Sequence, residues 1–151
     1  MTDNEDIYRK HCDELVRFAT GLVGPFDAQD VVTDACLRAF QSRSWEAVTN
    51  RRAYLYRSVL NQARTHHRST MRRRAREYAV AGPASIDPSP IDIDVLRAVA
   101  KLSVQQRASV FLTYWEDLRP AEVAARLNIS EGSVKRHLAR ARNRLKELLH
   151  D

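Results

Sequence analysis

The stretch from Arg51 to Arg76 combines arginine side chains with aromatic rings, a composition that suits binding to a nucleic acid. It contains no acidic residue, and its basic residues are Arg51, Arg52, Arg57, Arg64, Arg68, Arg72, Arg73, Arg74 and Arg76. The interleaved rings are those of Tyr54, Tyr56, His66 and His67. Because guanidinium groups bind phosphates and rings stack on bases, we expect this stretch to hold a nucleic-acid strand. A solvated basic face is the alternative, although like charges four residues apart repel unless a partner neutralises them.

A second basic segment, Arg119 to Leu149, reads as two helices joined by a tight turn. Pro120 suits the first position of a helix, Asn128 can end that helix in the left-handed conformation, and Ser130 can cap the next one. The apolar stripe of the second helix is Val134, Leu138, Ala141, Leu145 and Leu148, and its remaining faces are basic. This layout is typical of a helix-turn-helix, whose second helix enters the major groove. The alternative is an amphipathic hairpin with a solvated basic face.

The elements that position these residues are expected to be helices throughout, because apolar residues recur at helical spacing and the chain has only four glycines. The spacing predicts helices over residues 6–23, 28–40 and 51–76, with Asp27 as the cap of the second. Residues 41–50 break the periodicity and read as a loop. Within it, Trp45 either packs back onto the core or forms a surface that meets an unpaired base.

The segment between Glu77 and Ile93 cannot continue a helix, because it contains Gly82, Pro83, Pro88 and Pro90. Helical spacing resumes from Asp94, and Ser103 with Gln106 predicts a capping box for the following helix. We therefore predict an all-α fold of two small helical domains, residues 1–78 and 94–151, joined by a proline-containing linker over residues 79–93. The second is predicted to be a four-helix domain that includes the helix-turn-helix.

Composition limits the partners and the compartment. The chain has 151 residues, a formal charge of +6 and an isoelectric point near 9.7, which favour a polyanionic partner. No apolar run approaches the length of a membrane span and the N-terminus lacks a signal-peptide pattern, so we expect a cytoplasmic protein without membrane insertion. Cys12 and Cys36 lie on apolar helical stripes and are expected to be buried thiols. His11 has no spaced metal-binding partner, and neither a metal nor a cofactor is expected.

With its two cationic segments, the chain resembles bacterial RNA polymerase sigma factors of the extracytoplasmic-function group, in the sigma-70 family. In the N-terminal part the resemblance rests on AQDVVTDACLRAF (28–40) and AYLYRSVLNQARTHHR (53–68). In the C-terminal part it rests on LSVQQRASVFLTYWEDLRPAEVAARLNISEGSVKRHLARARNRL (102–145). Response-regulator domains share part of the last motif, whereas the order of both matches across a short linker is more specific to sigma factors.

The resemblance implies three binding surfaces. The outer face of helix 28–40 would dock on the clamp helices of the largest subunit of core RNA polymerase, through Gln29, Asp30, Thr33, Asp34 and Arg38. The opened −10 element of promoter DNA would be held by Trp45, Asn50, Arg51, Arg57, Asn61, Arg64 and Arg68. The −35 element would be read by Ser130, Ser133, Lys135, Arg136, His137 and Arg140. The C-terminal domain, including Leu112 and Trp115, would lie near the polymerase flap or be covered by an anti-sigma factor.

Three positions depart from the family pattern. Thr65 stands where sigma factors of this group usually have Asp, which puts the −10 preference or a local helix contact in doubt. Thr33 stands in place of Gln, and Arg119-Pro120 in place of a Ser or Thr cap, and both leave the interpretation intact.

The sequence leaves two alternatives to a sigma factor, a transcription regulator and a nucleic-acid enzyme. A transcription regulator would use only the helix-turn-helix and bind a palindromic site as a dimer without polymerase. The acid-free helix 51–76 disfavours it, because a dimer interface rarely carries so much like charge. A nucleic-acid enzyme would use His66 and His67 as acid–base groups, but adjacent residues point about 100° apart on a helix, and we expect no carboxylate nearby to orient them.

Overall fold

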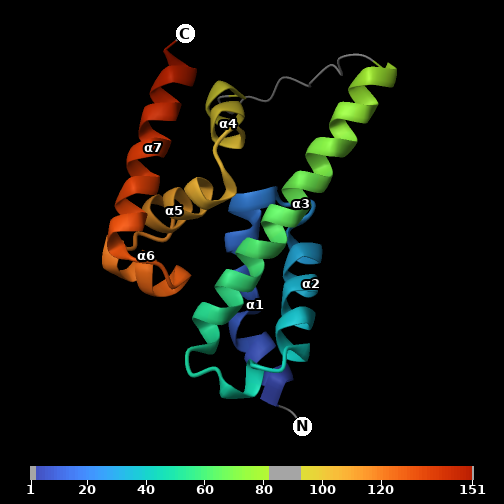
Figure 1. The fold of residues 1–151 in the computed structure, drawn as a ribbon, viewed down its shortest axis with the longest axis vertical. Helices are drawn as coiled ribbons and strands as arrows, with labels where there is room; N and C mark the ends of the chain where they lie inside the picture. Colours follow the sequence, from blue (N-terminus) through green and yellow to red (C-terminus); the bar gives the residue numbers. More distant parts are fainter. Residues whose placement is uncertain (1–2, 82–92, 151) are drawn as a thin grey trace.

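The structure is a computed structural model that describes residues 3–81 and 93–150. Within these ranges it contains no strand, which confirms the predicted all-α fold. Its elements, in chain order, are α1 (Asp3–Val23), α2 (Ala28–Gln41), the short 3-10 helix η1 (Trp45–Ala47), α3 (Arg51–Ala81), α4 (Ile93–Ala100), α5 (Val104–Tyr114), α6 (Pro120–Leu127) and α7 (Glu131–Leu149). Figure 1 shows α1, α2 and α3 side by side, with α5 and α6 against one side of them and α4 beside α7. None of the described helices is both long and apolar enough to span a bilayer.

The first three helices form the N-terminal half, a bundle built from three apolar stripes. The buried residues are Leu15, Phe18, Ala19 and Leu22 of α1, Ala28, Val31, Val32, Ala35, Cys36 and Ala39 of α2, and Ala53, Leu55, Tyr56, Val59, Leu60 and Ala63 of α3. Each set recurs at helical spacing, so one stripe of each helix faces the common core. Gly24 ends α1 with φ +90, a left-handed conformation that glycine adopts without strain.

The C-terminal half, α4 to α7, is delimited by caps that the sequence predicted. Ser103 accepts a hydrogen bond from the Gln106 backbone N–H, and the Gln106 side chain accepts one from Ser103 in return, which is the predicted capping box. Asn128 ends α6 with φ 54, and the Ser130 hydroxyl accepts the Ser133 N–H at the start of α7. Val134, Leu138 and Ala141 are the buried residues of α7, as the predicted stripe requires.

The third helix is longer than expected. It continues to Ala81, so residues 79–81, which the sequence predicts to be part of the linker, are helical. Residues 77–81 are Glu, Tyr, Ala, Val and Ala, none of which breaks a helix, and the first breakers are Gly82 and Pro83. The rest of the expected linker, residues 82–92, lies outside the described residues.

The two halves share one hydrophobic core. Residues of α1, α2 and α3 belong to the same buried cluster as Val104, Ala108 and Leu112 of α5 and Val123 and Leu127 of α6. The Phe18 and Phe111 rings lie 6.2 Å apart, and Phe111 packs directly over the backbone of Gly21. The sequence left open whether the halves pack together, and in this structure they do.

The cysteine prediction holds for one thiol and partly for the other. Cys36 is buried, and its burial raises the pKa of the thiol to about 11. Cys12 is half-buried, and both thiols are free. The high pKa keeps Cys36 protonated at neutral pH, so it behaves as a small apolar core residue.

Candidate nucleic-acid interface

One face of α3, which we call the strand face, carries Arg57, Asn61, Arg64 and Arg68. Asn61 and Arg68 are exposed, while Arg57 and Arg64 are half-buried. The Arg57 guanidinium lies 5.7 Å from the centre of the Tyr54 ring, and its buried Nε has no hydrogen-bond partner among the described residues. The predicted spacing thus brings four polar side chains into one row along α3. At the N-terminal end of this row, the Arg57 guanidinium lies beside the Tyr54 ring.

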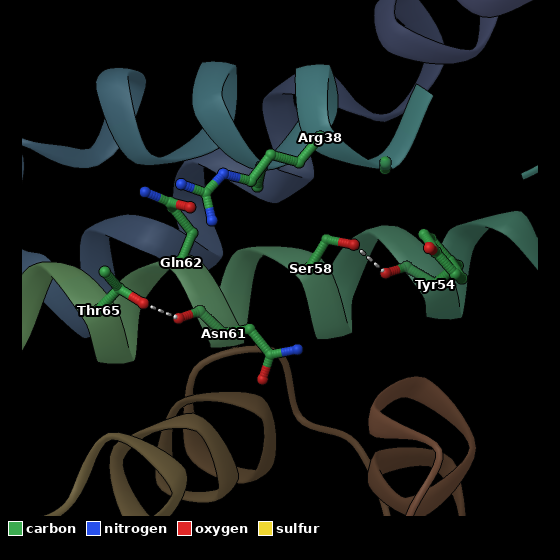
Figure 2. A pocket seen from close by; sticks show the side chains of 8 residues that line it. Arg38, Tyr54, Ser58, Asn61, Gln62 and Thr65 are labelled. Carbon is green, nitrogen blue, oxygen red and sulfur yellow. Dashed lines mark hydrogen bonds between the residues drawn. The ribbon is translucent and has the colours of Figure 1, made fainter. Parts of the chain in front are cut away.

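Two clefts flank this face, and Asn61 lines both. The first, of about 220 Å³, lies between α2 and α3 and is lined by Arg38, Tyr54, Ser58, Gln62 and Thr65 among others. In Figure 2, Arg38 and Gln62 lie between these helices, whereas Asn61 points from α3 toward the C-terminal half. The Ser58 and Thr65 hydroxyls bond to backbone carbonyls of their own helix, those of Tyr54 and Asn61. Thr65 therefore has a local helix role in this structure.

The second cleft, of about 380 Å³, lies between α3 and the C-terminal half. Arg57, Leu60 and Asn61 line it from α3, and Gln105 from α5. The far wall is the turn between α6 and α7, which contributes Leu127, Asn128 and Ile129. The strand face therefore looks onto the helix-turn-helix across this cleft.

Trp45 does not present its ring to solvent, which corrects its assignment as a DNA contact. It is 1% exposed, and its Nε1 donates to Asn4 Oδ1 at 2.9 Å. Its ring packs edge-on against Phe40 and Tyr54, with centroids 5.1 and 5.6 Å away. A base could reach this ring only if Trp45 left the core. Trp45 is therefore a loop residue that packs back onto the core, as the first of the two interpretations of the sequence allows.

The neighbouring residues order the start of α3. Asn50 Oδ1 accepts the Ala53 N–H at 3.1 Å and thus caps the helix, while the Asn50 side chain remains exposed. The Arg51 guanidinium lies 4.9 Å from the Trp45 ring centre and pairs with Asp3 at 2.9 Å and Glu46 at 3.5 Å. Much of the Arg51 charge is therefore neutralised within the chain.

The outer face of α2 is as exposed as the sequence predicted. The side chains of Gln29, Asp30, Thr33, Asp34 and Arg38 are all exposed. Gln29 Nε2 donates to Thr33 Oγ1 at 3.3 Å and to the Tyr8 hydroxyl at 3.2 Å, which fixes its orientation. Sequence reasoning missed Leu37, which is 54% exposed on the same face. Leu37 follows Thr33 by four residues and Asp34 by three, and this helical spacing could have placed it on the same face.

The first two turns of α7 carry an ordered polar surface. The Ser130 hydroxyl donates to Ser133 Oγ at 2.9 Å, and Arg136 Nη2 donates to the same oxygen at 2.9 Å. Lys135 pairs with Glu131 at 3.5 Å, while Arg136 and Arg140 are exposed. Ser133 is half-buried beneath Arg136 and holds it in place. This arrangement suits a helix whose N-terminal turns approach a DNA groove.

His137 of α7 is half-buried, whereas the neighbouring Arg136 and Arg140 are exposed. It lines a small cavity with Leu60 of α3, Gln105 and Ser109 of α5, and Ile129. Burial, and then the nearby charges of Arg140 and Arg136, lower the pKa of its imidazole. In this arrangement the His137 side chain is half-buried beside a cavity that Leu60 of the N-terminal half also lines.

The expectation that no carboxylate lies near the histidines of α3 was wrong. Asp27 Oδ2 lies 3.1 Å from His66 Nε2, because the start of α2 packs beside α3, and the Asp27 side chain does not cap α2. The Thr70 hydroxyl lies 3.3 Å from the same nitrogen. An acid–base relay needs a carboxylate on one ring nitrogen and a nucleophile on the other. Asp27 and Thr70 both lie near Nε2 of His66, so this histidine does not have the geometry of a relay. The described residues contain no cluster that could hold a metal ion.

An aromatic surface at the end of α5 was only partly foreseen. Trp115 is 76% exposed and stacks on Phe111, with the rings 6.2 Å apart at 11°. Tyr114 is 57% exposed, and its hydroxyl accepts two hydrogen bonds from the Arg142 guanidinium, at 3.1 and 2.9 Å. These contacts tie the end of α5 to the middle of α7.

Two family descriptions match separate parts of the chain: Sigma-70 region 2 matches residues 7–73, and Sigma-70, region 4 matches residues 92–145. The chain is 34% identical to the RNA polymerase sigma-E factor of Streptomyces coelicolor, over 96% of this chain and 85% of the relative. It is 30% identical to the ECF RNA polymerase sigma factor SigM of Mycobacterium tuberculosis, over 96% and 76% of the two chains. Among solved structures, it is similar to the sigma factor RpoE in complex with the anti-sigma factor NepR from Bartonella quintana. That match has a TM-score of 0.60 and 26% identity, and covers 99% of this chain and 98% of the other.

Proposed function

The chain belongs to the extracytoplasmic-function group of the sigma-70 family of RNA polymerase sigma factors, and on this premise we propose how its surfaces divide the work of promoter recognition. As a sigma factor it binds core RNA polymerase and directs initiation at promoters. We assign polymerase binding and the −10 element to residues 1–78, the connection to residues 79–93, and the −35 element to residues 94–151. The observation that carries this division is the match of region 2 and region 4, in that order, along one chain.

The exposed face of α2 docks on the clamp helices of the largest polymerase subunit. It presents the carboxylates of Asp30 and Asp34, which a DNA backbone would repel, together with Arg38. Leu37 adds an exposed apolar side chain within this polar surface. An apolar residue surrounded by charges is the composition expected of a protein interface rather than of a DNA interface.

The strand face holds the non-duplex −10 element. Asn61 supplies hydrogen-bonding groups beside the guanidinium groups of Arg57 and Arg64, and Arg68 provides a further cation for phosphates. Arg51, which pairs with Asp3 and Glu46, contributes less. The loop that ends at Asn50 takes a flipped base, and Trp45 supports this loop from within the core. Stacking contributes roughly 1–3 kcal/mol per base, comparable to the cost of unstacking one. Binding energy alone can therefore drive opening, and the protein acts without an enzymatic step.

The first turns of α7 read the −35 element in the major groove. Ser130 and Ser133 offer hydroxyls near the helix start, and Arg136, Arg140 and Lys135 provide cations along the exposed side. Arginine pairs bidentately with guanine, and the Ser133 contact pre-orients Arg136 for such a bond. His137 is only half-exposed, because it lines the small cavity beside Leu60, so it contributes less to this surface than Arg136 and Arg140.

The partners follow from this assignment. Core RNA polymerase provides the clamp helices and the flap, the latter near the exposed Trp115. Promoter DNA is the second partner, and an anti-sigma factor is the third, as in the solved complex of RpoE with NepR. Because the polymerase and the chromosome are in the bacterial cytoplasm, we place the working protein there.

Run-off transcription with purified core polymerase on a genomic promoter library tests the proposal. With this protein present, we expect transcripts from a new set of start sites that are absent with core polymerase alone. Identical start sites in both arms would contradict it. Tight binding to a palindromic site by a dimer without polymerase would instead indicate an ordinary helix-turn-helix regulator.

A further inference from the structure

A cavity of about 330 Å³ lies where the end of α1 meets α3, α4 and α5. None of its lining residues belongs to the polymerase-binding or DNA-binding surfaces assigned above. This volume is at the lower end of the range of small-molecule sites in proteins. Its polar lining residues are Asp27, His66, His67, Thr70 and Arg107, and its other walls are formed by residues 21–24, Val99 and Ala100.

The charged group of this cavity is the guanidinium of Arg107 on α5. The Arg107 side chain is 9% exposed, so it is more than nine-tenths buried. Its Nη1 donates to the Leu22 carbonyl at 2.6 Å, and its Nη2 donates to His67 Nδ1 at 3.3 Å. Its Nε–H is buried and has no hydrogen-bond partner among the described residues. The guanidinium therefore has one donor to spare, in a residue that lines the cavity.

The positive charge of Arg107 is also only partly compensated. Both of its partners are neutral in these contacts, because a carbonyl carries no charge and a ring nitrogen accepts a hydrogen bond only when it is unprotonated. The end of α1 offsets part of the charge, since a helix C-terminus carries roughly half a negative charge. Burial lowers the pKa of Arg107, as expected for a cation removed from water. A buried cation of this kind is stabilised by a counter-anion.

Asp27 is the only acidic residue among the described residues that line the cavity, and it faces a different partner. Its Oδ2 lies 3.1 Å from His66 Nε2, and the Thr70 hydroxyl lies 3.3 Å from the same nitrogen. No ion pair joins Asp27 to Arg107 in the described part of the chain. The polar lining is therefore divided into an Asp27–His66 pair and an Arg107–His67 pair, and an anion is favoured beside the second.

The remaining walls of the cavity suit an apolar group. Leu22 is buried and Val23 and Val99 are half-buried, and all three line the cavity. An inorganic ion beside Arg107 would leave these side chains in contact with water, whereas a ligand with a short hydrocarbon part would cover them. A metal ion does not fit, because the described residues contain no metal-binding cluster and Arg107 would repel a cation.

We propose that this cavity binds a small organic oxyanion, a phosphate or carboxylate that carries a short apolar group, and that Arg107 holds the charged end through Nε. The binding is stronger than that of the exposed arginines because the guanidinium lies in a low-dielectric environment. His67 orients the guanidinium through Nη2. The site is separate from the surfaces of the proposed function and does not depend on how the promoter elements are divided.

Nuclear magnetic resonance of the arginine Nε–H groups tests the proposal at the proposed atom. The full-length chain is titrated with phenyl phosphate at constant ionic strength, and the Arg107 signal is identified by its absence from Arg107→Lys. We expect this signal to move downfield and to saturate. Inorganic phosphate should move it in the same direction with an affinity about tenfold lower, because it lacks the apolar group. Phenol, which lacks the oxyanion, should leave the signal in place.

Affinity measurements on two matched variants separate this site from general attraction to a basic protein. Arg107→Gln and Arg97→Gln each remove one positive charge, but Arg97 is exposed on the neighbouring helix α4. By isothermal titration calorimetry, Arg107→Gln should weaken phenyl phosphate binding about tenfold or more, whereas Arg97→Gln should change it less than twofold. Circular dichroism verifies that both variants are folded.

Ala100→Phe keeps the test decisive if Arg107→Gln does not fold. Ala100 is exposed at the rim of the cavity, so a phenyl group there fills space without removing a core contact. We expect this variant to retain its helical circular dichroism and to lose phenyl phosphate binding about tenfold. An unchanged affinity would place the ligand elsewhere and overturn the proposal.

Three other outcomes would also overturn it. The first is an Arg107 Nε–H signal that does not move at saturating phenyl phosphate, which means that the cavity holds water only. The second is an equal loss of affinity in Arg97→Gln and Arg107→Gln, which means that the anion binds the general charge of the chain. The third is a shift of this signal by a T12 single strand but not by phenyl phosphate, which means that the phosphate group comes from DNA.

Discussion

Replacing Trp45 by alanine separates a core role from a base-stacking role. Trp45 is 1% exposed, packs on Phe40 and Tyr54, and donates a hydrogen bond to Asn4 at 2.9 Å. Removing a buried tryptophan costs about 3–5 kcal/mol, and a chain of this size loses roughly 2–4 °C of melting temperature per kcal/mol. We therefore expect Trp45→Ala to melt roughly 6–20 °C lower than the unmodified protein.

The other tryptophan provides the matched control. Trp115 is 76% exposed and touches the core only through its stacking on Phe111, so Trp115→Ala should change the unfolding free energy by about 0.5 kcal/mol or less. Circular dichroism at 222 nm during thermal unfolding measures both variants without relying on tryptophan fluorescence. If Trp45→Ala melts with Trp115→Ala and only fails to open promoter DNA, the ring is available to bases and the reasoning is wrong.

Three further predictions concern the binding surfaces and pH. Asn61→Ala should impair promoter opening, followed by permanganate footprinting, while leaving duplex −35 binding intact, and Arg136→Ala should do the reverse; equal effects of both on each step would refute the division of labour. Leu37→Asp should weaken binding to core polymerase about tenfold without changing the melting temperature, because Leu37 is 54% exposed on α2, and unchanged affinity would exclude this face from the docking surface. His137 has a pKa lowered by burial, Arg140 and Arg136, so the unfolded chain binds its proton first and stability falls as pH drops below the unfolded pKa of about 6.5. Urea midpoints between pH 7.5 and 5.5 should therefore fall more for the unmodified chain than for His137→Gln, and parallel curves would contradict the burial of this imidazole.

Local signals accounted for most of the elements. Ser103, Asn128 and Ser130 each act on a backbone group within a few residues, so their sequence context is sufficient to place a helix boundary. The exposed face of α2 followed from periodicity for the same reason. The predicted end of α3 is too early because residues 77–81 were grouped with Gly82 and the prolines that follow, although Gly82 is the first residue that disfavours the helix.

Local sequence patterns do not predict contacts between residues far apart in the chain. Trp45 stands in a loop, and its burial depends on Asn4, 41 residues earlier in the chain. The carboxylate beside His66 comes from Asp27, 39 residues away. Arg107 reads in sequence as one more surface cation of a basic protein, yet it is buried against Leu22, 85 residues away. No spacing rule connects such pairs, so they appear only when the helices are assembled into the tertiary fold.

The shared core also has a thermodynamic consequence. A domain of roughly 75 residues buries a smaller share of its surface than one of 150, so each half gains stability from the core that it shares with the other. The burial of Leu60 and of the Arg107 guanidinium depends on this packing, so substitutions in the shared core should lower the free energy of unfolding of both halves together.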